Sequence, residues 1–167
     1  GVSPVVNGFD LNAIEAALRL RDSGVDIEIT VLSVGSEFAM DVMKKPLAMG
    51  ADRLVLVDDP GLCQIDSAGT VKVLSAIMEK DGPFDLILGG RQASDWDQAH
   101  VMLGLAEVLG LPLVSLVQKL ELDGESVTVQ RVIPDGYQVI SAGYPLVLTI
   151  TNELGEPRYP NLRGIMQ

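Results

Sequence analysis

The fold is decided by the stretch FDLILGGRQASDWDQ, residues 84–98. Residues 84–88 form an apolar run with the length and composition of a buried strand. The polar segment 89–98 follows, and the residues after it predict a helix that stops at Gly110. The apolar positions on one face of that helix are Val101, Leu105, Val108 and Leu109. A buried strand that leads through a polar loop into a helix is the repeating unit of parallel α/β sheets.

The same alternation of strands and helices extends upstream. Strands are predicted over residues 27–34 and 53–57, and helices over residues 11–21, 36–49 and 67–80. Asp10 and Ser36 are the predicted N-caps of the first two helices, which Gly24 and Gly50 end. This alternation predicts an α/β fold with a doubly wound, Rossmann-like sheet that is mostly parallel and has helices on both faces. Such a sheet normally opens with a central strand, and we expect that this strand is missing.

Downstream, a short strand over residues 113–116 follows, and after it the pattern changes to that of mostly antiparallel strands. In order, strands are predicted over residues 113–116, 118–122, 126–131, 137–141 and 146–151. Asp123-Gly124, between the second and third of these, is typical of a tight hairpin turn. The last residues are rich in proline and glycine and show no period. We therefore predict one α/β domain over residues 1–151 and an extended C-terminal arm over residues 152–167.

Composition and charge exclude several classes of function. The 167 residues carry a net charge of −11, which would repel the phosphate backbone of nucleic acid. Cys63 is the single cysteine, so no internal disulfide can form, and a cytoplasmic location is the simplest expectation. The sequence has no signal peptide at its start and no apolar run long enough for membrane insertion. It also has no metal-ligand spacing and no nucleophile–base motif, so we predict neither a metal site nor catalytic residues.

A ligand site is expected beyond the carboxyl ends of the parallel strands, in the segments 33–36, 57–60 and 89–98. The last segment precedes a helix, whose first amides and positive dipole suit a phosphate group. The alternative is an ordinary polar loop in which Asp97 is the N-cap of the helix. Neither a dinucleotide fingerprint nor a Walker loop is present, so both interpretations stay open. His100, in the first turn of the helix, is predicted to face solvent or a phosphate rather than to act in catalysis.

Five segments resemble one known family in their order and spacing. They are NGFDLNAIEAALRL at 7–20, LSVG at 32–35, AMGADR at 48–53, GRQA at 90–93 with Asp95 and Asp97, and EPRYPNLRGIM at 156–166 after Asn152. Together they resemble the β subunit of electron transfer flavoproteins over nearly the whole chain. We interpret the chain as a divergent paralogue of that subunit.

The resemblance implies an electron-carrier subunit that pairs with an α subunit carrying redox FAD. The α/β domain would hold AMP, or FAD as in electron-bifurcating relatives, and the arm would dock flavin-dependent dehydrogenases. The implied pocket residues are Asn7, Ser33, Val34, Gly35, Gly90, Arg91, Asp95, Asp97, Gln98, Ala99, His100 and Val101. The implied docking residues are Arg158, Tyr159 and Leu162, with Leu162 as an exposed apolar anchor.

The sequence departs from the family pattern at the start of the helix after residue 98. Met102 stands where the family has glycine, which would narrow the approach of a phosphate, while His100 would add a hydrogen bond or a charge. The family's opening strand and basic tail are absent, so we expect the chain to be incomplete at both ends. A stand-alone regulatory module that binds adenine nucleotide is the alternative function, and the apolar anchor on the arm favours the subunit.

Overall fold

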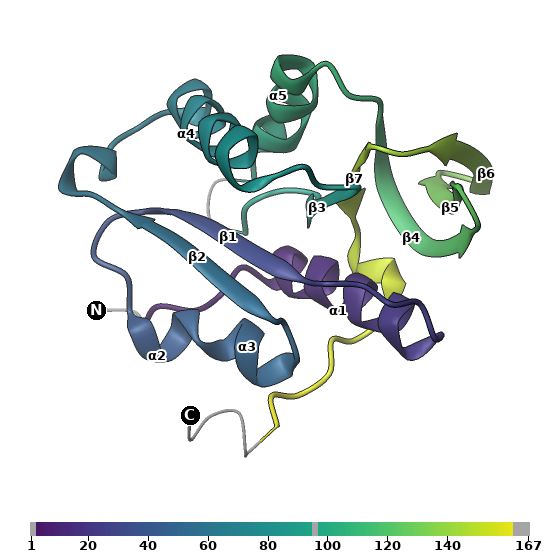
Figure 1. Cartoon of the computed structure of the whole chain (residues 1–167), viewed down its shortest axis with the longest axis horizontal. Helices are drawn as coiled ribbons and strands as arrows, with labels where there is room; N and C mark the ends of the chain where they lie inside the picture. The colour runs from purple at the N-terminus through teal and green to yellow at the C-terminus, as the bar shows by residue number, and fades with distance from the viewer. Residues whose placement is uncertain (1–2, 95–96, 162–167) are drawn as a thin grey trace.

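The computed structural model describes residues 3–94 and 97–161, and Figure 1 shows their arrangement. The first part contains α1 (Gly8–Asp22), β1 (Thr30–Gly35), α2 (Met40–Met43), α3 (Lys45–Met49), β2 (Arg53–Asp58), α4 (Ser67–Asp81), β3 (Leu86–Gly90) and α5 (His100–Leu109). The second part contains β4 (Leu113–Asp123), β5 (Ser126–Ile133), β6 (Gly136–Gly143) and β7 (Leu146–Ile150). Short 3₁₀ turns lie at Pro60–Leu62 and Asn152–Leu154. No helix of the described residues is both long and apolar enough to cross a membrane.

The described strands form two sheets. β1 and β2 pair in parallel, and the second sheet has the order β3-β7-β4-β5-β6. Its first three strands are parallel to one another, whereas β4, β5 and β6 are antiparallel. The C-terminal third is mostly antiparallel, as predicted, but β7 inserts between β3 and β4 and is parallel to both. All five residues of β7 are buried, as expected for a central strand covered on both faces.

Helices cover both faces of the second sheet (Figure 1). On one face, Ala13, Ala16 and Leu20 of α1 pack in a core with Leu146 and Leu148 of β7. On the other face, the buried residues Leu105 and Ala106 of α5 pack with Ile87 and Val147. The predicted doubly wound α/β fold with a mostly parallel sheet is therefore confirmed, and the predicted antiparallel region is present as β4, β5 and β6.

The predicted helix over residues 36–49 is two short helices. α2 begins after Ala39 rather than Ser36, and α3 follows it directly. Pro46 explains the break, because proline lacks an amide proton and its ring clashes with the carbonyl four residues earlier. Gly50 ends α3 with φ of 125°, as predicted.

The helix α5, which follows residues 84–98, differs from its prediction in one buried position. Leu105 and Leu109 lie toward the sheet, but Val108 is 57% exposed. Ala106 completes the buried face in its place.

The hairpin predicted at Asp123-Gly124 is confirmed, with Gly124 and Glu125 between the paired residues Asp123 and Ser126. The two strands predicted before it are a single strand, β4, whose register shifts near Leu116. Leu116 has φ of 60°, and its amide donates a hydrogen bond of 2.9 Å to Oγ1 of Thr149.

Candidate functional site

A cavity of about 1110 Å³ lies between the two sheets. It is lined by β1 and β3, and by residues of α1 and α4 such as Ile14 and Leu74. The edges of β1 and β3 that face it pair with no other strand in the described part of the chain. The middle of the cavity is therefore bordered by two open strand edges. The carboxyl end is bounded by polar loops instead, and it is the candidate ligand site.

The start of α1 is tied to the end of β3 at this edge. The carboxylate of Asp10 accepts a hydrogen bond of 2.7 Å from the amide of Gly90. Nδ2 of Asn7 donates to the carbonyl of Gln92 at 3.0 Å and to Asp10 at 2.9 Å, and the hydroxyl of Ser94 donates to Asn7. The prediction that Asp10 is the N-cap of α1 was therefore wrong. The helix begins at Gly8, and the Asp10 carboxylate binds the amide of Gly90 at the end of β3 instead.

Gly89 and Gly90 are both closely packed, Gly90 against backbone atoms and Gly89 against a side chain. A Cβ atom on Gly90 would lie 2.6 Å from Cβ of Phe9 and 2.8 Å from the amide nitrogen of Asp10. A Cβ atom on Gly89 would lie 2.4 Å from the sulfur of Met102. Met102 thus packs onto the strand end and also contacts the core formed by α4 and α5.

Arg91 supplies positive charge at the carboxyl end of β3. Its guanidinium lies 5.3 Å from the centre of the Phe9 ring, a cation–π distance, and its Nε donates to Oε1 of Gln92 at 3.1 Å. A hydrogen bond from Thr151 holds the pKa of Glu153 below its ordinary value, and the charge of Arg91 adds a smaller contribution. Arg91 is therefore oriented by an aromatic ring and an amide, and it lines the cavity.

The first turn of α5 has no side-chain cap among the described residues. Its N-cap residue is Ala99, and no side chain in the described part of the chain bonds to the first amides. The prediction that Asp97 is the N-cap was wrong, because Asp97 has φ of 53° and its carboxylate accepts a hydrogen bond from the Gln92 side chain. The first amides and the positive end of this ten-residue helix border the cavity, where Ala99 and Val101 line it.

Most of the pocket residues implied by the sequence come together here. Those that line the cavity are Asn7, Ser33, Val34, Gly90, Arg91, Gln98, Ala99 and Val101. Gly35, Asp97 and His100 do not line it, and Asp95 lies outside the described residues. Gln92 and Ala93, in the expected segment 89–98, also line it, as does Asp10, which the sequence had not assigned to the pocket. Within residues 3–94 and 97–161, no three His, Cys, Asp or Glu side chains form a group that could hold a metal.

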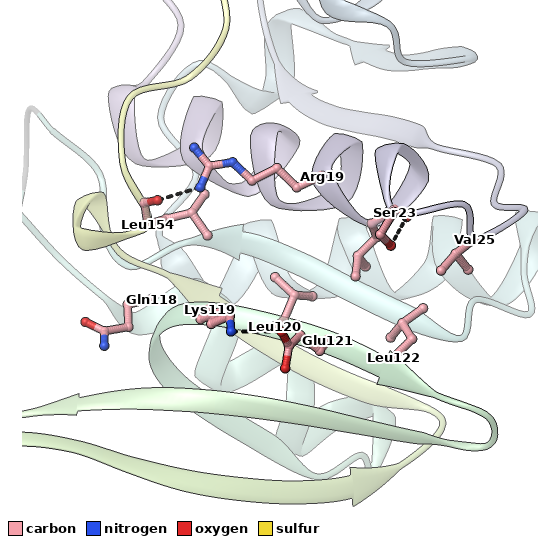
Figure 2. A pocket seen from close by; sticks show the side chains of 10 residues that line it. Arg19, Ser23, Val25, Gln118, Lys119, Leu120, Glu121, Leu122 and Leu154 are labelled. Atoms are coloured by element: carbon pink, nitrogen blue, oxygen red, sulfur yellow. Dashed lines mark hydrogen bonds and ion pairs between the residues drawn. The ribbon is translucent and has the colours of Figure 1, made fainter.

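The C-terminal arm lies beside α1 and is hydrogen-bonded to it. Arg158 is bound to carboxylates of α1, Tyr159 is 90% exposed, and Leu162 lies outside the described residues. A separate hollow of about 540 Å³ lies between α1 and β4 beside the start of the arm (Figure 2). Figure 2 shows Arg19 at its border, where Nη1 donates to the carbonyl of Leu154 at 2.7 Å.

The family model described as "Electron transfer flavoprotein domain" matches residues 2–167. This chain belongs to the electron transfer flavoprotein family. It is 40% identical to electron transfer flavoprotein subunit beta of Megasphaera elsdenii, with 100% of the chain covered, and 40% identical to the subunit beta of Thermoanaerobacterium thermosaccharolyticum, with 99% covered. It is 37% identical over 99% of its length to caffeyl-CoA reductase-Etf complex subunit CarD of Acetobacterium woodii.

The chain spans 64% of the length of the first of these relatives and 63% of each of the other two. The resemblance to electron transfer flavoprotein β subunits that the sequence had indicated is confirmed by the family model and the relatives together.

Proposed function

We propose that this protein is the β subunit of an electron transfer flavoprotein. It pairs with an α subunit that carries FAD, receives electrons from flavin-dependent dehydrogenases and passes them to a membrane or soluble acceptor. It acts in the cytoplasm as a carrier subunit and performs no catalysis itself. Membership of the family and the names of the relatives support this proposal, including the relative named for a caffeyl-CoA reductase complex.

The carboxyl end of the cavity would hold the phosphate of AMP or FAD. The observation that carries this assignment is the first turn of α5, which no side chain of the described residues caps and which borders the cavity together with the cation Arg91. Helix amides and an arginine are the groups that bind phosphate, and the small residues Ala93 and Ala99 leave room for it. Bound there, the nucleotide would contribute structure if it is AMP and a second redox centre if it is FAD.

An acidic residue at the N-cap of α5 tests the phosphate site. In Ala99→Asp the new carboxylate caps the helix, which should stabilise the nucleotide-free protein by about 0.5–1 kcal/mol, and it repels a phosphate. We therefore expect the purified heterodimer of this variant to lose its nucleotide. Val108→Asp is the control, because it adds the same charge at the far, exposed end of the same helix.

The measurement is the nucleotide content of each heterodimer after acid extraction. An unchanged content in Ala99→Asp would contradict the assignment to α5. A chain that stays monomeric beside its α subunit but retains nucleotide would support the stand-alone regulatory module instead.

A further inference from the structure

The arm is held by a row of polar side chains on one face of α1. Asn12, Glu15, Arg19 and Asp22 follow one another at spacings of three or four residues, which places them on the same side of a helix. Nδ2 of Asn12 donates to the carbonyl of Gly155 at 2.8 Å. Arg19 donates to the carbonyl of Leu154 at 2.7 Å and to that of Glu156 at 3.5 Å.

Glu15 is the centre of this row. It is only 4% exposed, and its Oε2 accepts hydrogen bonds from the amide of Arg158 at 3.1 Å and from Nε of Arg158 at 2.8 Å. Its Oε1 accepts from Nε of Arg19 at 2.9 Å and from Nη2 of Arg158 at 3.3 Å. The same Nη2 lies 2.6 Å from a carboxylate oxygen of Asp22. One buried carboxylate thus binds both the backbone and the side chain of Arg158.

A buried ion pair of this kind contributes geometry more than stability. Removing two charges from water offsets much of their attraction, and apolar residues of similar size would serve a core as well. Burial is the largest single influence on the pKa of Glu15 and raises it, but the hydrogen bonds from Arg158 and Arg19 together outweigh it, so the pKa is lowered. Glu15 is therefore charged at neutral pH, and its partners fix where Arg158 lies.

The fixed geometry presents Tyr159 to solvent. Arg158 is held by α1 on one side of Tyr159, and on the other side the amide of Asn161 donates to the carbonyl of Ala48 at 2.8 Å. The Tyr159 residue between these two attachments is 90% exposed. An exposed aromatic side chain on an immobilised backbone is the type of residue that anchors protein interfaces, because little conformational freedom is lost when it binds.

We propose that Glu15 is a positioning residue that holds the arm in a preordered form, so that Tyr159 is presented to the electron-donating dehydrogenase. Arg158 then attaches the arm from the inside and is not itself a contact for the dehydrogenase. This inference rests on the proposed function, in which dehydrogenases donate electrons to the heterodimer, and on the docking role that the family resemblance implies for the arm. To that function it adds the residue of α1 that positions the docking arm, and it gives a reason for the buried charge of Glu15.

The test uses the intact αβ heterodimer and a flavin-dependent acyl-CoA dehydrogenase as the electron donor. Glu15→Gln and Arg158→Gln should raise the KM for the heterodimer about tenfold and leave kcat unchanged, because the arm must be ordered at each encounter. Hydrogen exchange of residues 155–161 should become faster in both variants. Arg158→Gln lies in the arm, so it reports on the attachment even if Glu15→Gln lowers the stability of the domain.

Two further variants separate positioning from contact. Tyr159→Ala should raise KM to a similar extent while the exchange of the arm stays as in the wild type. Glu79→Gln, which removes an exposed carboxylate on α4, should change neither quantity. Faster hydrogen exchange of the arm in Glu15→Gln with an unchanged KM would overturn the inference. Hydrogen exchange as in the wild type in both Glu15→Gln and Arg158→Gln would also overturn it. A wild-type heterodimer that accepts no electrons would instead refute the proposed function.

Discussion

Gly90 brings the end of β3 into contact with the first turn of α1. The space beside its Cα is filled by backbone and Cβ atoms of Phe9 and by the amide of Asp10, and its own amide donates to the Asp10 carboxylate. Gly89 is also confined, but by the flexible side chain of Met102. The two glycines therefore differ in how the structure can respond to a larger residue.

Alanine substitutions should reveal this difference. Gly90→Ala should lower the free energy of unfolding by about 2–3 kcal/mol, because backbone atoms must move. Gly89→Ala should have a smaller effect, and it should cost less still when it is made in a Met102→Ala background, where the side chain that it meets is absent. Urea unfolding measures all three, with Gly143→Ala as the control, since a Cβ atom there meets nothing within 4 Å. Equal losses for Gly89→Ala and Gly90→Ala would contradict this account.

The ionisation of Glu15 predicts how stability depends on pH. Its pKa is lowered from the ordinary value of 4.5, so its contribution is complete above that pH and is lost as the pH falls through the lower folded value. The difference in unfolding free energy between wild type and Glu15→Gln should be constant between pH 5 and 8, at about 3 kcal/mol, and shrink in acid. Urea titrations at several pH values measure it, and a difference that grows in acid would show that the sign is wrong.

Strands β4 and β7 share a feature that needs a polar residue inside the sheet. The register of β4 shifts near Leu116, which has a positive φ, and the Leu116 amide finds its acceptor in the hydroxyl of Thr149. Thr149 is only 2% exposed. A buried amide without an acceptor is costly, so this hydroxyl explains a polar residue in an otherwise apolar strand.

Thr149→Val keeps the shape of the side chain and removes the acceptor. It should lower the free energy of unfolding by about 1–3 kcal/mol, the usual effect of leaving a buried group unsatisfied. Thr149→Ser retains the hydroxyl and should lose less. Thermal unfolding of the two variants gives the comparison, and a valine variant at least as stable as the serine variant would contradict the assigned role.

Local patterns predicted the order of helices and strands, and they predicted helix ends where the cause is local. Gly50 and Gly110 end their helices as expected, because a positive φ is a property of the residue itself. The predicted caps Asp10 and Asp97 were wrong, because their carboxylates bind Gly90 and Gln92, groups that tertiary structure brings to them. The sequence also contained no local signal for the place of β7, since strand order depends on contacts far apart in the chain.

The pocket was more predictable than the arm. Strand ends and a helix start place its residues, and both follow from the α/β pattern together with the segments that resemble the family. The attachment of the arm was not predictable, because Glu15 and Arg158 are far apart in the sequence. Locally, Glu15 looks like an ordinary charged helix residue and Arg158 like an ordinary loop residue.

In the whole molecule, α1 connects the two regions to which we assign function. Its first turn, through Asp10, is bonded to the strand end that borders the candidate nucleotide site. Its later turns, through Glu15, hold the arm that presents Tyr159.

The most direct test of the central claim is the nucleotide content of the intact αβ heterodimer. The purified complex is extracted with acid, and the released nucleotides are identified and quantified by chromatography and absorbance. We expect one adenine nucleotide for this chain in addition to the FAD of the α subunit, seen either as one AMP beside one FAD or as two FAD. A stable heterodimer that releases a single FAD and no AMP would contradict the claim that this chain holds a nucleotide.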